Sequence, residues 1–284
     1  MATARKDKRH NHRQRLSGLY CDVGDVQALQ YDVSGAISSY QRATELDAQS
    51  ARAHVGLGDS YALAERDDDA HGAYLRALDA DPTNGEAHFC LADLLARAGR
   101  LRDAVFEMEL AVECEPDRAY YCYRLADLYA RVGDEEMAEE ALRCAIGLDP
   151  EEGLYPYKLG ELHCRAGAWL SAAEAYLQAT RCAPLDDFYH VRLASALIRL
   201  DRREAAVRVL RRTVRISPDN RAYRYLLGEL MVLNGDLEGG SYQLRRAGRL
   251  DYYDRDCVRR VKTRAGQLRE DEKLVLISAV DPPA

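Results

Sequence analysis

A period of 34 residues dominates this sequence. Small residues return at that interval, and the clearest row consists of Gly24, Gly58, Ala92, Ala126, Gly160, Ala194 and Gly228. Proline returns at the same interval, at Pro82, Pro116, Pro150, Pro184 and Pro218. Seven intervals follow one another without a gap: residues 17–50, 51–84, 85–118, 119–152, 153–186, 187–220 and 221–254. Such a chain folds as an array, because no single unit buries its apolar face without its neighbours.

Each interval predicts two helices joined by a tight turn. With positions counted from the first residue of an interval, positions 4, 7, 8 and 11 share one face of a first helix, and positions 20, 24 and 27 share one face of a second. Glycine or alanine at positions 8 and 20 lets the two backbones approach closely. Glycine at position 15 suits the end of the first helix, and proline at position 32 stops the second.

This pattern resembles the tetratricopeptide repeat (TPR) family, whose unit is a helix-turn-helix with small residues at positions 8, 20 and 27 and proline at position 32. The resemblance covers residues 17–254 without a change of register. It implies an all-α fold, a right-handed α-solenoid (superhelix) of seven units. We therefore expect an elongated array whose core grows from one unit to the next.

The two ends of the array depart from the repeat. Residues 1–16 carry six basic residues and one acidic residue without apolar periodicity, which predicts a disordered basic arm. In the seventh interval, Gly239 and Gly240 are expected to interrupt the second helix. Apolar residues at helical spacing predict a capping helix over residues 255–270. Residues 271–284 form a C-terminal tail that turns apolar and either packs on the array or extends from it.

Composition narrows the class of protein. The net charge is −7 although the first residues are basic, so the array itself is acidic and does not suit general nucleic-acid binding. No apolar run is long enough to span a bilayer and no secretory signal is visible, so we expect the cytoplasm. The eight cysteines contain no CxxC pair, which favours reduced, buried or half-buried thiols over a disulfide framework.

Catalytic and metal-binding patterns are not found in this sequence. It contains no Walker-type loop and no HExxH, GxSxG or GxGxxG motif. The segment from Glu161 to Cys164 holds three reactive side-chain types, but adjacent residues on a helix point in different directions. His54, His88 and His190 all fall on packing position 4, so we expect core histidines. The sequence thus predicts a non-enzyme without cofactor, metal or small-molecule substrate.

Three rows of residues mark the candidate binding site. In the TPR family the first helices line a concave wall through positions 2, 5, 6, 9, 12 and 13. Position 9 is almost always acidic in this chain, position 13 is arginine in four successive units, and positions 2, 5 and 6 add aromatic and basic residues. We predict partner contacts from Tyr120, Tyr123, Arg124, Asp127, Arg131, Tyr157, Lys158, Glu161, Arg165, Phe188, Arg192, Arg199 and Tyr225.

One other interpretation of these rows stays open. Asp93 and Arg97, like two later acid–arginine pairs, are spaced i,i+4 and stabilise a helix without any ligand. A separate row of tyrosines occupies position 3, faces the preceding unit and is expected to pack between repeats; it consists of Tyr121, Tyr155, Tyr189 and Tyr223. One branch of the family binds C-terminal carboxylates through Lys at position 5 and Asn at position 9, and this chain has neither.

The resemblance favours a non-catalytic adaptor that holds a peptide segment or helix of a partner protein in its concave groove. In a first alternative, residues 1–16 tether the array to RNA, anionic membrane or polyanion, which predicts strongly salt-dependent affinity. In a second, the exposed tyrosines join copies of the chain into a homo-oligomer. Function lies in the variable positions of the repeat, and their sequence does not identify the partner protein.

Overall fold

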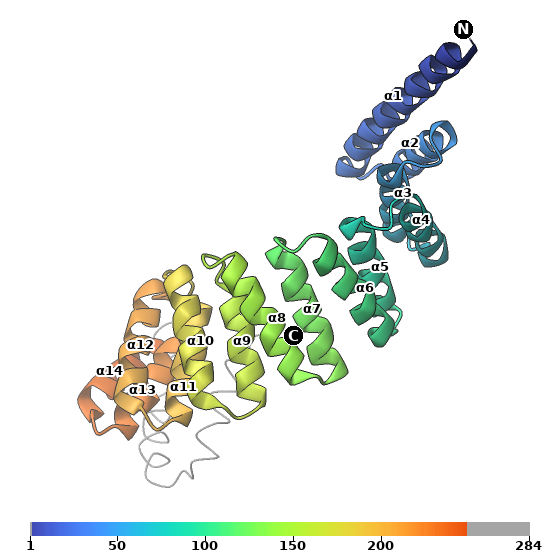
Figure 1. Cartoon of the computed structure of the whole chain (residues 1–284). Coiled ribbons are helices and arrows are strands. Elements are labelled where there is room, and N and C mark those ends of the chain that lie inside the picture. Colours follow the sequence, from blue (N-terminus) through green and yellow to red (C-terminus); the bar gives the residue numbers. More distant parts are fainter. Residues whose placement is uncertain (1, 249–284) are drawn as a thin grey trace. The chain divides into compact units, whose positions relative to one another are not determined.

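The computed structural model describes the backbone of residues 2–248 and the side chains of residues 11–248. Over these residues fourteen α-helices follow one another, and no strand occurs among them (Figure 1). Each predicted interval holds one pair of helices. The prediction of an all-α array of seven helix pairs is therefore confirmed.

The chain divides into two compact units, Met1–Leu148 and Asp149–Ala284, and each is described by itself. The first unit holds repeats 1 to 4, with α1 (Ala2–Leu29), α2 (Val33–Leu46), α3 (Ala51–Leu63), α4 (Asp67–Ala80), α5 (Gly85–Arg97), α6 (Leu101–Cys114), α7 (Ala119–Val132) and α8 (Glu135–Leu148). The second holds repeats 5 to 7, with α9 (Leu154–Arg165), α10 (Trp169–Cys182), α11 (Asp187–Arg199), α12 (Arg203–Ile216), α13 (Arg221–Leu233) and α14 (Leu237–Gly248).

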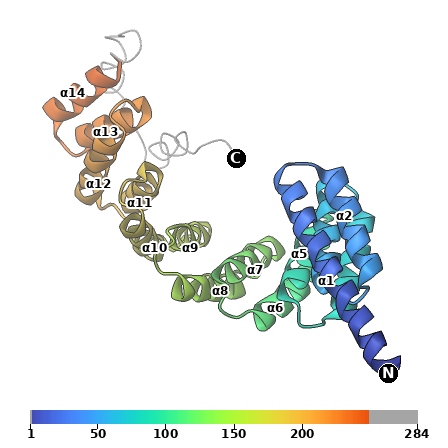
Figure 2. The same ribbon diagram turned by 90° about the horizontal axis from the view of Figure 1, so that it is seen from above.

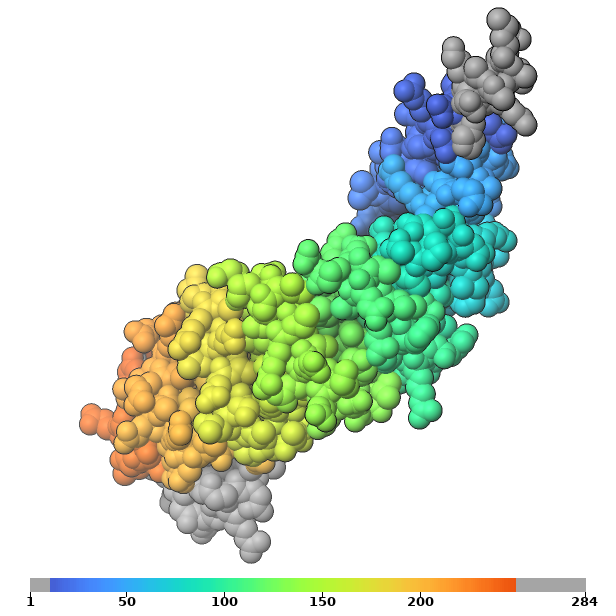
Figure 3. Space-filling model, viewed as in Figure 1, coloured from blue at the N-terminus to red at the C-terminus, as the bar shows by residue number. Residues whose placement is uncertain are grey.

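Within each unit, helices that are neighbours in sequence are neighbours in space (Figure 2). The space-filling view shows this as successive bands of colour along each unit (Figure 3). This is the arrangement of a repeat array, in which each unit buries its apolar face against the next. Polar residues at position 34 begin several first helices, since Asn84 accepts a hydrogen bond of 2.8 Å from the backbone of Ala87, and Ser50, Asp186 and Asn220 cap their helices in the same way.

The side chains at positions 8 and 24 of a repeat are complementary in size. A Cβ atom added to Gly160 would lie 2.5 Å from the ring of Tyr176, so only glycine fits opposite this tyrosine. Glycine at position 8 also faces tyrosine at position 24 in repeats 1 and 2 and Leu244 in repeat 7, whereas alanine at position 8 goes with Met108, Leu142 or Leu210. The predicted close approach of the two helices is thus tuned to one bulky core side chain per repeat.

All seven turns between paired helices pass through the left-handed region at position 15. Four of them use glycine, with φ between +72° at Gly167 and +94° at Gly133. The other three use Tyr31, Glu65 and Asp201, with φ of +61°, +57° and +55°. Side chains other than glycine pay a steric cost in this region, so these three turns carry local strain.

The histidines at position 4 are core residues, as predicted. His54, His88 and His190 are all buried, and each uses Nε2 to bond a carbonyl oxygen six residues earlier. The carbonyl acceptor of His190 is that of Pro184, at 3.1 Å. In the seventh repeat Arg224 takes the same place and donates from Nε to the carbonyl of Pro218 at 2.7 Å.

The ends of the array differ from the sequence-based predictions. Helix α1 begins at Ala2, whereas a disordered arm was predicted over residues 1–16. Near its middle this helix is held to α2, because Ser17 is buried and donates to the carbonyl of Ala43, and Arg13 donates to the carbonyl of Glu45. Helix α14 also runs without a break through Gly239 and Gly240. A Cβ added to Gly240 would lie 2.7 Å from the carbonyl oxygen of Gly228, and one added to Gly239 would lie 2.5 Å from the side chain of Met231, so glycine permits close packing of α13 against α14. The predicted capping helix and tail lie outside the described residues.

No helix within residues 2–248 is both long enough and apolar enough to cross a bilayer.

Candidate functional site

The predicted contact residues all lie on the first helices of repeats 4 to 7. Helix α7 carries five of them, Tyr120, Tyr123, Arg124, Asp127 and Arg131. Helices α9, α11 and α13 carry the others, Tyr157, Lys158, Glu161 and Arg165, then Phe188, Arg192 and Arg199, and finally Tyr225. The α7 group belongs to the first compact unit and the remaining residues to the second.

In the first unit, an aromatic cluster surrounds one arginine. We call Phe89, Asp93, Tyr120, Tyr121 and Arg124 the Arg124 cluster. The rings of Phe89 and Tyr121 stack at 4.9 Å with 12° between their planes, and the ring of Tyr120 lies 5.7 Å from Phe89. The guanidinium of Arg124 lies 5.6 Å from the centre of the Phe89 ring, within reach of a cation–π contact.

The polar bonds of Arg124 complete this cluster. Its Nη1 donates to the hydroxyl of Tyr120 at 3.1 Å, and its Nη2 forms an ion pair with Asp93 of the preceding repeat. Burial by itself would lower the pKa of Arg124, but the hydrogen bonds that Arg124 donates to Tyr120 and Asp93 outweigh burial and raise it. The arginine therefore stays charged and is fixed in place by two repeats.

The second unit contains a matching cluster. We call Tyr157, Glu161, Phe188, Tyr189 and Arg192 the Arg192 cluster. The rings of Tyr157 and Tyr189 stack at 5.4 Å with 23° between their planes, and Phe188 lies 5.3 Å from Tyr157. Arg192 lies 5.9 Å from the Phe188 ring centre and donates from Nε to Glu161 at 2.9 Å. Tyr176 donates its hydroxyl to the same carboxylate oxygen of Glu161.

Both clusters use the same positions of the repeat. Positions 5 and 9 of one repeat supply an aromatic ring and an acid, and positions 2, 3 and 6 of the next repeat supply two rings and the arginine. The Arg192 cluster therefore repeats the Arg124 cluster two repeats later. Two of the position-3 tyrosines pack between repeats as predicted, since Tyr121 stacks on Phe89 and Tyr189 stacks on Tyr157 of the preceding repeat.

The position-9 acids Asp93 and Glu161 pair with an arginine of the next repeat rather than with the arginine four residues later on their own helix. The i,i+4 interpretation applies weakly to Asp93, whose carboxylate lies 4.0 Å from Arg97 but pairs more closely with Arg124. Among the described residues, no ion pair joins Asp127 to Arg131 or Glu161 to Arg165. Asp93 and Glu161 are thus engaged by the next repeat. Asp127 has no hydrogen-bond or ion-pair partner within residues 11–248.

The accessible part of this wall includes one ring of the Arg124 cluster and several arginines outside the two clusters. Tyr120 is 47% exposed although its ring contacts Phe89, Tyr123 and Arg124. Arg131 is exposed and donates to the carbonyl of Ala96 at 3.0 Å. In the second unit Arg165 and Arg199 are exposed as well. These residues present one rigid aromatic face and several guanidinium groups to solvent.

Sequence reasoning missed one member of the wall. Trp169 begins α10, a second helix, yet the guanidinium of Arg199 lies 4.4 Å from the centre of its ring. Only first-helix positions were expected to line the wall, so Trp169 fell outside the pattern. The sequence signal that could have indicated Trp169 is that it is the only tryptophan of the chain. Elsewhere in the second unit, Lys158 lies 6.0 Å from the Tyr157 ring and Arg221 lies 6.0 Å from Tyr225.

The segment from Glu161 to Cys164 does not form an activated thiol. Burial raises the pKa of Cys164, and its sulfur lies 3.4 Å from the hydroxyl of Tyr176. A nucleophilic cysteine needs the opposite shift, toward the thiolate. In the described part of the chain no three His, Cys, Asp or Glu side chains are grouped to hold a metal ion.

Family models of known proteins match several parts of this sequence. Three models of the tetratricopeptide repeat match residues 30–85 and 191–249, residues 73–106, and residues 119–152. A search of curated proteins gave no match. The fifth repeat lies outside the matched ranges, yet it forms the helix pair α9 and α10 like the others.

Solved structures of TPR proteins share this architecture. The C-terminal part of a TPR repeat-containing protein from Cytophaga hutchinsonii aligns with a TM-score of 0.71 at 13% identity, covering 84% of this chain and 98% of that one. The Pseudomonas aeruginosa protein pilF aligns with a TM-score of 0.61 at 17% identity, covering 73% of this chain and 94% of that one. YrrB, described as a TPR protein with an unusual peptide-binding site, aligns with a TM-score of 0.54 at 16% identity, covering 64% of this chain and 93% of that one.

Identities this low speak for the fold alone, whereas the family models match the sequence itself. They cover more than half of the chain, and the helices pair in the register of the repeat. The chain belongs to the tetratricopeptide repeat family.

Proposed function

We propose that this protein is a non-catalytic interaction scaffold whose first-helix wall binds a peptide segment or helix of a partner protein. TPR repeats and the similarity to TPR proteins, among them one described with a peptide-binding site, support the general role. The choice of the first-helix wall as the binding surface rests on one observation: Tyr120 is 47% exposed while its ring and hydroxyl both contact neighbouring side chains.

A fixed, exposed aromatic ring is what a binding surface needs. An aromatic anchor contributes most to affinity when little conformational freedom is lost on binding. The exposed Arg131 lies eleven residues later on α7, about 16 Å along the helix axis, and adds a charge that suits a carboxylate of the partner. In the second unit, Arg165 and Arg199 offer the same chemistry. The expected ligand is therefore a segment that carries an apolar or aromatic side chain and, several residues away, an acidic one.

Capture from native lysate tests this proposal with three forms of the intact chain. The unchanged protein is compared with Tyr120→Ala and with the control variant Tyr242→Ala. Tyr242 is a close match, because it is 50% exposed and accepts a hydrogen bond from Arg246 four residues later, but it lies on a second helix. Arg165→Glu tests the second unit in the same way.

We expect one partner to be retained by the unchanged protein and by Tyr242→Ala, and to be lost or weakened about tenfold by Tyr120→Ala, the usual range for an aromatic anchor. All variants must first show unchanged melting temperatures. If Tyr120→Ala and Arg165→Glu both keep the partner at full affinity, the first-helix wall is not the binding surface.

A further inference from the structure

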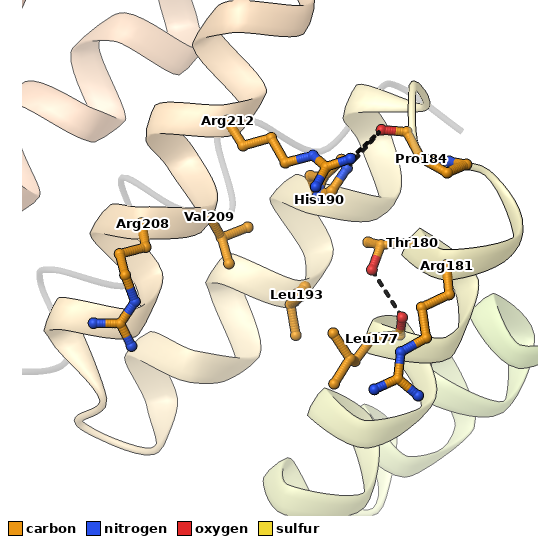
Figure 4. A pocket seen from close by; sticks show the side chains of 9 residues that line it. All are labelled: Leu177, Thr180, Arg181, Pro184, His190, Leu193, Arg208, Val209 and Arg212. Carbon is orange, nitrogen blue, oxygen red and sulfur yellow. Dashed lines mark hydrogen bonds between the residues drawn. The ribbon is translucent and has the colours of Figure 1, made fainter.

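A pocket in the second unit is built from the second helices rather than from the first-helix wall. It lies between α10 and α12 over α11 and has a volume of about 480 Å³ (Figure 4). Leu177, Leu193 and Val209 form its apolar floor. Leu177 is 41% exposed, so part of this apolar floor opens to solvent. This surface suits an apolar side chain of a docked segment.

Arginines surround this floor. Arg181 extends from α10, and Arg208 and Arg212 extend from α12 (Figure 4). We call the pocket the Arg208 groove. Arg212 reaches the carbonyl of Pro184 at 3.5 Å, whereas Arg181 and Arg208 have no hydrogen-bond or ion-pair partner among the described residues. None of the nine residues that line the groove is acidic. Its charge is therefore not balanced from within.

The equivalent positions in other repeats do not share this chemistry. The floor leucine and the rim arginines occupy positions 25 and 29 of one repeat and positions 22 and 26 of the next. Between repeats 2 and 3 these positions hold Leu75, Asp79, Phe106 and Leu110, and between repeats 3 and 4 they hold Glu109, Glu113, Glu140 and Cys144. Between repeats 6 and 7 they hold Arg211, Arg215, Tyr242 and Arg246, so arginines recur there but the leucine at position 25 does not. The combination of a leucine floor with an arginine rim is thus specific to the junction of repeats 5 and 6.

The same chain contains a segment of complementary chemistry. Residues 270–272 are Glu, Asp and Glu, and after Lys273 residues 274–277 are Leu, Val, Leu and Ile. Twenty-one residues separate this segment from Gly248, the last residue of α14. With residues 255–269 helical as predicted and the rest extended, this linker spans about 40 Å, enough to pass the helices between α14 and the groove at about 8–10 Å each. A tethered segment also has an effective concentration on the order of millimolar.

We propose that residues 270–277 dock in the Arg208 groove of their own chain. The carboxylates face Arg181, Arg208 and Arg212, and the apolar side chains cover Leu177 and Val209. This contact lies on the second helices and is independent of the partner-binding wall proposed above. Since its specificity comes from exposed charges, it weakens as salt is raised.

Photo-crosslinking in the full-length chain tests this contact directly. The photoreactive residue p-benzoylphenylalanine replaces Leu177, and the crosslinked peptides are identified by mass spectrometry after irradiation. The control places the same residue at Leu75, which is 43% exposed and occupies the same position of repeat 2 without an arginine rim. We expect crosslinks from position 177 to residues 270–277 within one chain, and none of these from position 75.

Charge substitutions then separate this contact from chance proximity. Glu270→Gln, Asp271→Asn and Glu272→Gln together should lower the crosslink yield about tenfold, because they remove the charge-assisted contacts while leaving every described residue unchanged. Arg208→Glu with Arg212→Glu should do the same, and lysines at positions 270–272 should restore the yield in that variant. Crosslinks between two copies, crosslinks to another segment, no crosslinks, or a yield unaffected by the tail substitutions would each overturn the proposal.

Discussion

The Cβ atom that Gly58 lacks would lie 2.4 Å from the ring of Tyr74. The hydroxyl of this tyrosine donates to Asp59 at 2.8 Å, so positions 8, 9 and 24 of the repeat act as one packed group. The same group returns in repeats 1 and 5. It joins the two helices of a repeat through one buried ring and one carboxylate on the first-helix wall.

Adding a methyl group at Gly58 should therefore destabilise the array. Tyr74 is 3% exposed and has no free space to move into, so Gly58→Ala is expected to cost about 1–3 kcal/mol, the usual range for overpacking a core. Adding Tyr74→Leu should recover part of this loss, because alanine at position 8 with leucine at position 24 is the combination of repeats 4 and 6. The midpoint of urea unfolding measures both effects.

Gly72 supplies the control for this prediction. It lies inside α4, and a Cβ added there meets nothing within 4 Å. Gly72→Ala should stabilise the protein by up to about 1 kcal/mol, because alanine favours the helix without a steric cost. Equal unfolding midpoints for Gly58→Ala and Gly72→Ala would contradict the packing argument.

The carboxylate of Asp59 should make stability depend on pH. Burial raises its pKa above the ordinary value of 3.8, and the hydrogen bond from Tyr74 offsets this shift only in part. The folded state then holds the proton more tightly than the unfolded state, so this contribution to stability is present at low pH and is lost as pH rises through the folded pKa. Asp59→Asn keeps an acceptor for Tyr74 and removes the charge.

We therefore expect Asp59→Asn to gain stability relative to the unchanged protein as pH rises from about 4 to about 7, the range above the ordinary carboxyl pKa. Urea unfolding at several pH values checks this, with Asp68→Asn as a control at an exposed site of the same repeat. A difference between Asp59→Asn and the unchanged protein that stays constant with pH would show that burial does not control this carboxylate.

Substitutions at position 15 should change the stability of the protein without altering its core. Glu65 has φ of +57° and lies in an exposed turn, so Glu65→Gly should stabilise by about 1 kcal/mol by removing left-handed strain. Gly133→Ala should cost a similar amount, because Gly133 has φ of +94° and open space around it, which leaves backbone strain as the main effect. Opposite shifts of the melting temperature in the two variants are the expected result.

The repeat period predicted the elements that depend on local sequence. Helix pairs, turns at position 15 and core histidines at position 4 all follow from residues within one repeat, where helical spacing is decisive. The continuity of α14 did not follow, because Gly239 and Gly240 lower helix propensity while the close packing of α13 against α14 outweighs that cost.

Contacts between repeats were harder to predict. Asp93 and Arg97 are spaced for a pair along one helix, but the closer partner of Asp93 is Arg124, 31 residues away. Glu161 is bound in the same way by Arg192. Helical spacing indicates which residues share a face, whereas these pairs depend on how far one repeat is rotated against the next. That rotation is a property of the packed array.

The two thiols of Cys122 and Cys144 should form a disulfide under oxidising conditions. Their sulfur atoms lie 3.0 Å apart across α7 and α8, and only Cys144 is exposed. Burial and the neighbouring Cys144 thiol raise the pKa of Cys122 to about 12, so Cys144 is the thiol that attacks an added disulfide reagent. With oxidised glutathione, Cys144 forms a mixed disulfide, and Cys122 then displaces reduced glutathione. The net change is the loss of two hydrogens from the protein and the release of two molecules of reduced glutathione.

This bond closes a loop of about 20 residues, which should raise stability by about 3 kcal/mol and increase the melting temperature. Peptide mass mapping should show the linked pair, and a reductant should reverse the shift. Cys144→Ser should abolish both effects, whereas Cys182→Ser, a partly buried thiol in the other unit, should leave them unchanged. A melting temperature that rises equally in Cys144→Ser would assign the effect to other thiols.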